Sequence, residues 1–183
     1  MKITPSAKIP DVLVIEPTVH RDERGVFLES WHEKRLASAG LAATFVQDNH
    51  SRSRRGTLRG LHYQMGNPQG KLVSVVQGEV YDVAVDLRRS SPTFCQWVHE
   101  GLSSDNHSQL WIPPGFAHGF YVLSESADLL YKCTTYYSAD HDRTIRWDDP
   151  DLAIDWPLLD GRPPILSAKD ASAPLLRDAP AYP

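Results

Sequence analysis

The chain is divided into short β-rich runs by turn-forming residues at fairly regular intervals. This pattern is typical of an antiparallel sandwich or barrel, because folds that alternate strand and helix need longer helical periods between their strands. At 183 residues the chain has room for one domain with a substantial core. We therefore expect a single, mainly β domain.

One alternating run predicts a strand with two distinct faces. In VYDVAVDLR, apolar side chains from Tyr81 to Leu87 alternate with two aspartates and an alanine. The preceding run, KLVSVVQ, reaches it through Gly78, a residue suited to a tight turn. The two runs are therefore predicted to form a β-hairpin.

Two later runs are predicted to line one cavity. QLWIPPGFAHGFYVLS breaks at Pro113-Pro114-Gly115 and resumes with His118 and Phe120 on one face. In DLLYKCTTYY, Tyr131 falls on the apolar face of a similar alternation.

A helical pattern at SWHEKRLASAG carries its own start and stop signals. Ser30 followed by Glu33 fits a capping box, and Gly40 fits the end of a helix. The segment is short, so we expect it to be one of a few short peripheral helices.

The single domain, residues 1–183, is expected to have three parts. We place an N-terminal segment at about 1–50, the core of the fold at about 51–150 and a C-terminal arm at about 151–183. The end of the arm is rich in Pro, Ala and Asp, so it needs contacts with the core to hold it in place.

Composition excludes several partners. With 19 basic and 23 acidic residues, the chain has a formal net charge of −4, so we expect no nucleic-acid or membrane binding. SRSRR holds Arg52 and Arg54 but has no accompanying RNA-binding motif, and we interpret it as a solvated loop. Without a signal peptide or membrane-spanning run, the protein is expected to be cytoplasmic. Cys95 and Cys133 are expected to be reduced, half-buried strand residues.

Two histidine motifs resemble those of the cupin-type jelly roll. GTLRGLHYQ contains His62 and PPGFAH ends at His118. A metal site in such a barrel needs several His or carboxylate donors, but the remaining positions hold Gln64 and Lys71. Because an ammonium repels a divalent cation, we predict that no metal is bound. A fixed positive charge can instead stabilise a negative charge that forms during a reaction.

Six segments carry a more specific resemblance. In chain order they are RGTLRGLHYQ, QGKLVSVVQGEVYDVAVDLRRSSPTF, QLWIPPGFAHGFYVLS, YKCTTYY, WDDPDLAIDWP and LSAKD. Together they span nearly the whole chain and resemble the dTDP-4-dehydrorhamnose 3,5-epimerase family. The resemblance implies a cupin-type jelly roll (double-stranded β-helix), a homodimer, and neither metal nor other cofactor. It also implies inversion of C3 and C5 of dTDP-4-dehydro-6-deoxy-D-glucose, in the biosynthesis of dTDP-L-rhamnose.

That reaction requires three chemical roles. A base removes the proton next to the ketone, a cation holds the enolate, and an acid returns a proton to the opposite face. His62 is the predicted base, since an imidazole titrates near neutral pH, and the resemblance pairs it with Asp170. Lys71 is expected to stabilise the oxyanion and Tyr131 to be the acid, with His118 assisting nearby.

From the pattern alone, these residues also fit structural roles. A histidine in a β-rich chain is most often a structural residue, and Tyr131 alternates with apolar neighbours as a core aromatic does. Asp170 lies far from His62 in the sequence, so only the resemblance at LSAKD pairs them.

A nucleotide diphosphate needs cations and a planar clamp for its base. Arg24 and Arg59 suit bidentate phosphate contacts, which the corresponding arginines of the family make. RDERGVFLES places Phe27 and Glu29 on one side of an extended segment, suited to thymine. By resemblance this segment comes from the partner subunit, so a homodimer with shared sites is expected.

Three further residues complete the predicted substrate site. Gln47 and Asn49 alternate with their neighbours in VQDNH and are expected to approach the nucleotide or sugar, although a polar turn also fits. Tyr137 is expected to close the base pocket. Two positions depart from the family: His20 stands where an aromatic residue is expected, and Thr135 replaces an acidic residue.

Other functions fit parts of the same pattern. Relatives that epimerise only C3 share the same His, Lys, Tyr and Asp set, so the motifs leave the number of inversions open. A metal-dependent cupin would need more ligands than the motifs supply. A non-catalytic sugar-binding jelly roll would need neither acid nor base.

Overall fold

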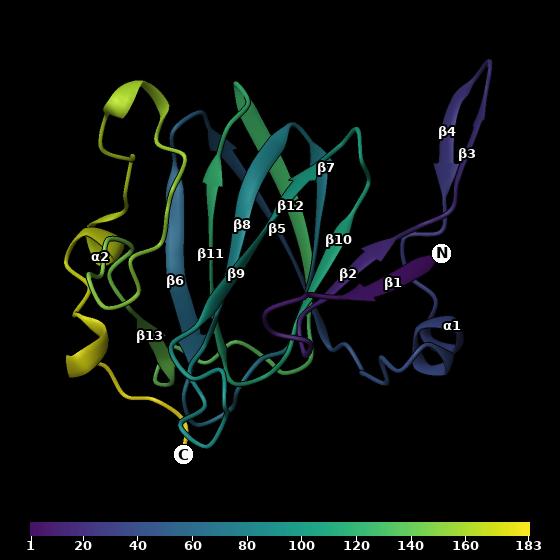
Figure 1. Ribbon diagram of the computed structural model, residues 1–183. Coiled ribbons are helices and arrows are strands. Elements are labelled where there is room, and N and C mark those ends of the chain that lie inside the picture. The colour runs from purple at the N-terminus through teal and green to yellow at the C-terminus, as the bar shows by residue number, and fades with distance from the viewer.

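Two antiparallel β-sheets face each other in the computed structural model, which describes residues 1–183 (Figure 1). One sheet contains, in spatial order, β1 (Lys2–Pro5), β2 (Leu13–Glu16), β10 (Gln109–Ile112), β7 (Lys71–Gln77), β12 (Ser126–Cys133) and β5 (Gln47–Arg54). The other contains β13 (Asp142–Thr144), β6 (Leu58–Gln64), β11 (Phe116–Val122), β8 (Glu79–Asp86) and β9 (Trp97–Ser103). The predicted mainly β jelly roll is confirmed.

The remaining elements are short and lie outside the sandwich. A separate hairpin of β3 (Val19–Asp22) and β4 (Gly25–Leu28) projects from it (Figure 1). The helical elements are α1 (Glu33–Ser38), α2 (Ala168–Ala171) and the 3-10 turns η1 (Leu159–Gly161) and η2 (Leu176–Asp178).

Helix α1 lies where the sequence predicts it, but with a different start. His32, not Ser30, is the N-cap, and its side chain accepts a hydrogen bond from the Arg35 backbone N–H at 3.5 Å. Ser30 is held elsewhere, because its carbonyl accepts a bond from Gln109 at 2.9 Å. The predicted capping box is therefore wrong. Gly40, with φ +95°, directly follows the C-cap Ala39.

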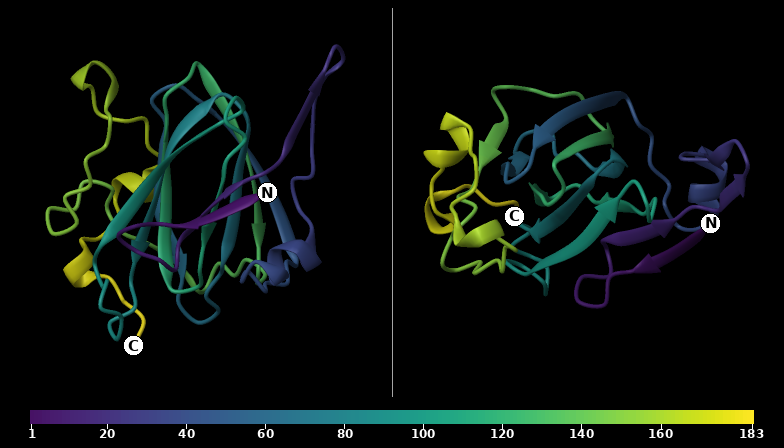
Figure 2. Two further views of the ribbon diagram at one scale, coloured as in Figure 1. Left: turned by 45° about the vertical axis from the view of Figure 1, so that its right-hand side comes forward. Right: turned by 90° about the horizontal axis from the view of Figure 1, so that it is seen from above.

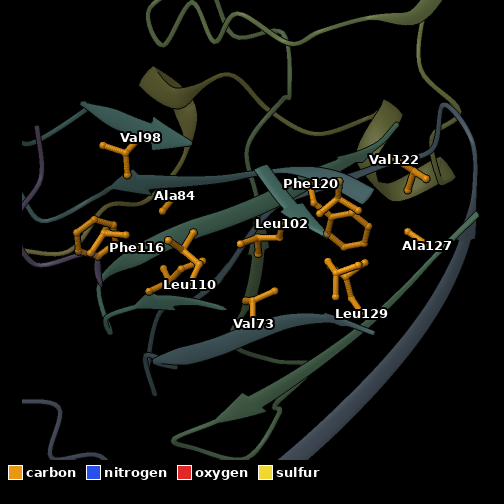
Figure 3. Packing of buried hydrophobic residues seen from close by; sticks show 14 of the residues in the cluster. Val73, Ala84, Val98, Leu102, Leu110, Phe116, Phe120, Val122, Ala127 and Leu129 are labelled. Carbon is orange, nitrogen blue, oxygen red and sulfur yellow. The ribbon is translucent and has the colours of Figure 1, made fainter. Parts of the chain in front are cut away.

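The main core fills the space between the sheets (Figure 3). Val73 and Leu129 from the six-stranded sheet and Ala84 and Phe120 from the five-stranded sheet belong to it, and each is at most 4% exposed. Alternating strands place one set of side chains inward, so burial of this apolar surface holds the sheets together.

Both outer faces are covered by terminal segments (Figure 2). On the five-stranded sheet, Val83 and Val85 belong to a second cluster with Trp156 and Tyr182 of the C-terminal arm. On the six-stranded sheet, residues from β2, β7 and β10 form a third cluster with Leu36 of α1. The arm is therefore packed against the core along its length.

The strands β7 and β8 do not form the predicted hairpin. β7 pairs with β10 and β12, whereas β8 pairs with β9 and β11 in the other sheet. Gly78, at φ +79°, carries the chain from one sheet to the other. The prediction is wrong because alternation and a glycine turn do not reveal whether consecutive strands pair or lie across a sandwich.

Three smaller expectations can be compared with the structure. SRSRR is not a solvated loop, because β5 runs to Arg54 and Arg52 makes two hydrogen bonds to the buried Asp128, at 2.7 and 2.6 Å. Cys133 is buried in β12, but Cys95 lies outside the strands; both are free thiols. The chain contains no helix with the length and apolar character needed to span a membrane.

The turn at Gly78 gives a stability prediction. A Cβ at Gly78 would lie 2.1 Å from the Ser126 carbonyl oxygen, and a side chain disfavours φ +79°, so Gly78→Ala should lower the free energy of unfolding by about 2 kcal/mol or more. Gly101→Ala is the matched control, since nothing lies within 4 Å of its Cβ position. Urea denaturation measures both, and equal effects would contradict the role of the turn.

Candidate active site

A pocket of about 390 Å³ has walls from both sheets and from the loop after β12. Lys71 and Tyr131 come from the six-stranded sheet, and His62 and His118 from the five-stranded sheet. Of the residues singled out from sequence, the pocket is lined by Gln47, Asn49, Arg59, His62, Lys71, His118, Tyr131 and Tyr137. The structure thus gathers residues that lie up to 90 positions apart in the chain.

The C-terminal arm brings Asp170 to His62. Ile165 donates to the Gly56 carbonyl at 2.8 Å and accepts from the Leu58 N–H at 3.0 Å, which fixes the arm beside the start of β6. Helix α2 follows, and His62 Nε2 lies 2.5 Å from Asp170 Oδ1. His62 and Asp170 are therefore in contact, as the resemblance implies.

The environment of Asp170 keeps its carboxylate ionised. Burial raises the pKa of Asp170, but the hydrogen bond and charge of His62, the Ser167 contact and the charge of Lys169 together bring that pKa below its usual value. An ionised acceptor at Nε2 leaves Nδ1 of His62 as the proton-accepting nitrogen. An imidazole held in this way is suited to act as a general base.

Lys71, at the start of β7, places a buried cation in the pocket. Its exposed fraction is 9%, and burial lowers the pKa of its ammonium group. The nearby Cys133, Asp82 and Asp142 oppose that shift, and Lys169 adds to it. Holding this charge costs stability, which a negative charge on a bound ligand would restore.

His118 forms a second buried histidine–carboxylate pair, with Asp82. Its Nε2 lies 3.0 Å from both carboxylate oxygens, and the side chains are 7% and 0% exposed. Burial lowers the pKa of His118, and the charge and hydrogen bond of Asp82 oppose that shift. Sequence reasoning missed Asp82, although an acidic residue in the middle of an apolar strand was a usable signal.

Tyr131 packs against the main core and also borders the pocket. Burial, with a smaller effect of Cys133, raises the pKa of Tyr131, while Arg59 lowers it. The phenol therefore keeps its proton at neutral pH and can donate it. The core interpretation and the pocket interpretation of Tyr131 are therefore compatible, because one part of the side chain packs against the core and the residue also lines the pocket.

The polar residues of β5 extend the same wall. Gln47 donates to Asn49 at 3.0 Å and accepts from the Tyr137 N–H at 2.9 Å, so the alternative interpretation of VQDNH as a polar turn is wrong. Arg59, on β6, donates from Nε to Ser53 at 2.9 Å. Its remaining guanidinium donors face a pocket that it lines.

Several lining residues were not predicted from sequence. Asp142 forms an ion pair with Lys169 and accepts from the Tyr137 hydroxyl at 3.1 Å. These residues lie on the short strand β13 and on α2, and only the fold of the arm places them together. Gln69, Ser51 and Tyr63 add to the polar lining, together with Gln64, which the sequence already placed beside the histidine motif.

Three predicted residues do not reach this pocket within the chain. Arg24 pairs with Asp22 at 2.5 Å, and Phe27 is 71% exposed on the projecting β3–β4 hairpin. Glu29, just beyond β4, pairs with Arg35 at 2.9 Å. The β3–β4 hairpin, which carries Arg24 and Phe27, projects away from the sandwich (Figure 1).

Neither of the two positions that depart from the family motif lines the pocket. His20 lies on β3, with its ring centroid 6.3 Å from that of Phe27. Thr135 lies in the loop after β12, where its carbonyl accepts from Gln69 at 2.7 Å. No group of three or more His, Cys, Asp or Glu side chains could hold a metal ion.

Comparison with known proteins finds close relatives over the whole chain. The family model described as dTDP-4-dehydrorhamnose 3,5-epimerase matches residues 6–178. The dTDP-4-dehydrorhamnose 3,5-epimerase of Pseudomonas aeruginosa is 56% identical over 184 residues, covering 100% of both chains.

Solved structures agree with this relationship. The dTDP-6-deoxy-D-glucose-3,5-epimerase of Legionella pneumophila, in complex with dTDP-4-keto-L-rhamnose, is 53% identical with a TM-score of 0.94, covering 100% of this chain and 98% of that one. A 3'-monoepimerase from Streptomyces bikiniensis, in complex with dTDP-quinovose, is 32% identical with a TM-score of 0.87, covering 95% and 87%.

The burial of Lys71 predicts a stability cost at the site. Lys71→Met should raise the free energy of unfolding at pH 7 by on the order of 1 kcal/mol, because it removes a buried charge. The pKa of Lys71 is lower in the folded state than in the unfolded state, whose value is 10.5. The wild type therefore gains stability as the pH rises from the folded pKa towards 10.5. The stability advantage of Lys71→Met should shrink over the same pH range.

Denaturation at pH 7 and pH 10 measures this difference. Lys132→Met is the control, since Lys132 is already paired with Asp48 at 2.9 Å and its loss should not stabilise. A Lys71→Met variant that is less stable than the wild type at pH 7 would contradict the prediction.

Proposed function

Because the chain belongs to the dTDP-4-dehydrorhamnose 3,5-epimerase family, we propose that it inverts C3 and C5 of dTDP-4-dehydro-6-deoxy-D-glucose, giving dTDP-4-dehydro-L-rhamnose. One observation carries the proposal: His62 and Tyr131 stand on facing sheets and border one pocket with the buried Lys71. Inversion next to a ketone needs a base and an acid on opposite faces of the sugar, and this arrangement supplies them.

His62 is the base in this proposal. Its Nδ1 takes the proton from the carbon next to the C4 ketone, while Asp170 stabilises the imidazolium that forms. The buried carboxylate thus acts through His62 by fixing the ring and compensating its charge.

Lys71 then stabilises the enolate oxygen. Its ammonium is already desolvated, so a developing negative charge interacts with it strongly. Tyr131, protonated at neutral pH, returns a proton to the other face, and His118 with Asp82 supplies a polar wall nearby. The reaction as proposed needs no cofactor, because side chains supply every proton and charge.

The nucleotide is held at the rim of the same pocket. Arg59 binds the diphosphate, Gln47 and Asn49 approach the nucleotide or sugar, and Tyr137 closes over the base. Arg24, Phe27 and Glu29 belong to the proposal only if the hairpin enters the pocket of a second copy. The exposed Phe27 at 71% supports such a homodimer, since apolar groups on a projecting hairpin gain by burial.

A C3-only epimerase is the second candidate. It is favoured by the likeness to the Streptomyces bikiniensis monoepimerase over 95% of this chain. The 53% identity to the Legionella pneumophila 3,5-epimerase favours two inversions.

Turnover in heavy water tests the number of inversions. Incubation with dTDP-4-dehydro-6-deoxy-D-glucose should place deuterium at both C3 and C5, as located by NMR. Label at C3 alone would establish the single inversion instead, and no label at either carbon would remove the epimerase proposal.

Substitution separates the base from the acid. Tyr131→Phe should still exchange substrate protons with solvent, because His62 can remove a proton and return it to the same face. Inversion should fall by roughly 10²- to 10⁴-fold, and His62→Ala should lose both exchange and inversion. Inversion by Tyr131→Phe at nearly the wild-type rate would make Tyr131 a core aromatic only.

Binding of the diphosphate gives an independent prediction. The free 4-keto sugar should be a poor substrate, because binding energy from the nucleotide positions the reacting carbons. Arg59→Lys should raise KM, because the ammonium of lysine cannot make the bidentate contact of a guanidinium. Comparable kcat/KM for the free sugar and the nucleotide sugar would show that the diphosphate is not used.

A further inference from the structure

Gln64 occupies the polar position two residues after the catalytic histidine, where a metal-binding barrel would place a ligand. It ends β6, is 3% exposed and borders the pocket. We propose that Gln64 is a positioning residue, which holds the loop carrying Tyr137 in place for the nucleotide. This inference rests on the proposed function, because Tyr137 is assigned there to the base of the substrate.

The carboxamide of Gln64 is committed to the chain on both sides of Tyr137. Its Nε2 donates to the Tyr136 carbonyl at 3.3 Å and to the Asn67 carbonyl at 2.9 Å, and its Oε1 accepts from the Ser138 N–H at 2.6 Å. A side chain with a donor and an acceptor in one plane can replace a backbone strand partner in this way. One N–H donor is used by the loop that carries Tyr137 and the other by Asn67, in the turn after β6, so the side chain has no donor left for a ligand.

The loop needs such a partner because its aromatic residues do not anchor it. Tyr136 is 67% exposed and Tyr137 is 56% exposed, and the loop between β12 and β13 is not paired in a sheet. Exposed loops of this kind are mobile unless their backbone groups are held. The amide of Gln64 therefore supplies order that hydrophobic burial does not.

The backbone of Gln64 fixes a second contact of Tyr137. Gln64 is the β-ladder partner of Asp142, and Asp142 accepts from the Tyr137 hydroxyl at 3.1 Å. Both the backbone and the hydroxyl of Tyr137 are thus held, directly or through a neighbour, by the end of β6. The same strand carries His62 two residues earlier. A shift of the loop would separate the base-binding end of the pocket from the catalytic end.

Gln64→Met tests the inference, because methionine has a similar length but makes none of these hydrogen bonds. Gln109→Met is the matched control: Gln109 is also 3% exposed and donates two bonds, to Ser30 at 2.9 Å and Ser74 at 3.0 Å, but it does not line the pocket. Both variants should lose thermal stability. Only Gln64→Met should weaken dTDP binding, by about tenfold in Kd by calorimetry, and raise KM similarly with kcat within about threefold.

A double-mutant cycle checks that Gln64 acts through Tyr137. In a Tyr137→Ala background, Gln64→Met should weaken dTDP binding by less than about twofold, since the residue that it positions is gone. A further tenfold loss there, or a wild-type Kd in the Gln64→Met protein, would overturn the inference. If Gln64→Met does not fold, Gln64→Leu gives the same comparison, because leucine is also uncharged and makes none of these hydrogen bonds.

The wild-type protein separates this inference from the proposed function. Absence of turnover by the wild type would remove the epimerase proposal, whereas dTDP binding by the wild type and its Gln64 variants would still decide the role of the glutamine. Normal wild-type turnover with unchanged KM and Kd in Gln64→Met would remove the inference alone.

Discussion

Face-to-face packing of the two sheets is the constraint on which the rest of the molecule depends. The apolar residues between the sheets are almost fully buried, and their removal from water fixes the distance between the two walls. The pocket exists because polar side chains replace apolar ones over part of the same interior. Its two walls are therefore as rigidly placed as the core, which suits chemistry on two faces of one ligand.

Charge compensation decides which polar residues this interior tolerates. Asp170 is held ionised by His62, and Asp82 lies against His118 and opposes the loss of the Lys71 proton. Cys133 and Asp142 also oppose that loss, but burial still lowers the pKa of Lys71, so its ammonium would gain from an anionic ligand. A divalent metal ion would meet repulsion from that ammonium, whereas an enolate would complete the site.

The two ends of the chain have different relations to the sandwich. The C-terminal arm is packed and hydrogen bonded, and it delivers Lys169 to the pocket wall and Asp170 to His62. The N-terminal part contributes β1 and β2 to the six-stranded sheet, while its β3–β4 hairpin leaves the body of the molecule with Phe27 exposed. β5 begins at Gln47, so the division near residue 50 expected from sequence passes through a strand. The arm contributes to the site within one chain, whereas the hairpin does not reach the pocket of its own chain.

Local chemistry in the sequence determined the fold class, the two histidine motifs, the position of Lys71 beside them and most of the strands, because period-two alternation and turn residues act over a few neighbours. It did not decide which strands pair. Gly78 predicted a hairpin but carries the chain between sheets, and Ser30 predicted a cap but is held by Gln109. Only the tertiary structure brought Asp82 and Asp142 into the site, because their partners lie 36 and 78 residues away in the chain. Contacts of that kind depend on how whole sheets pack, and no local pattern encodes them.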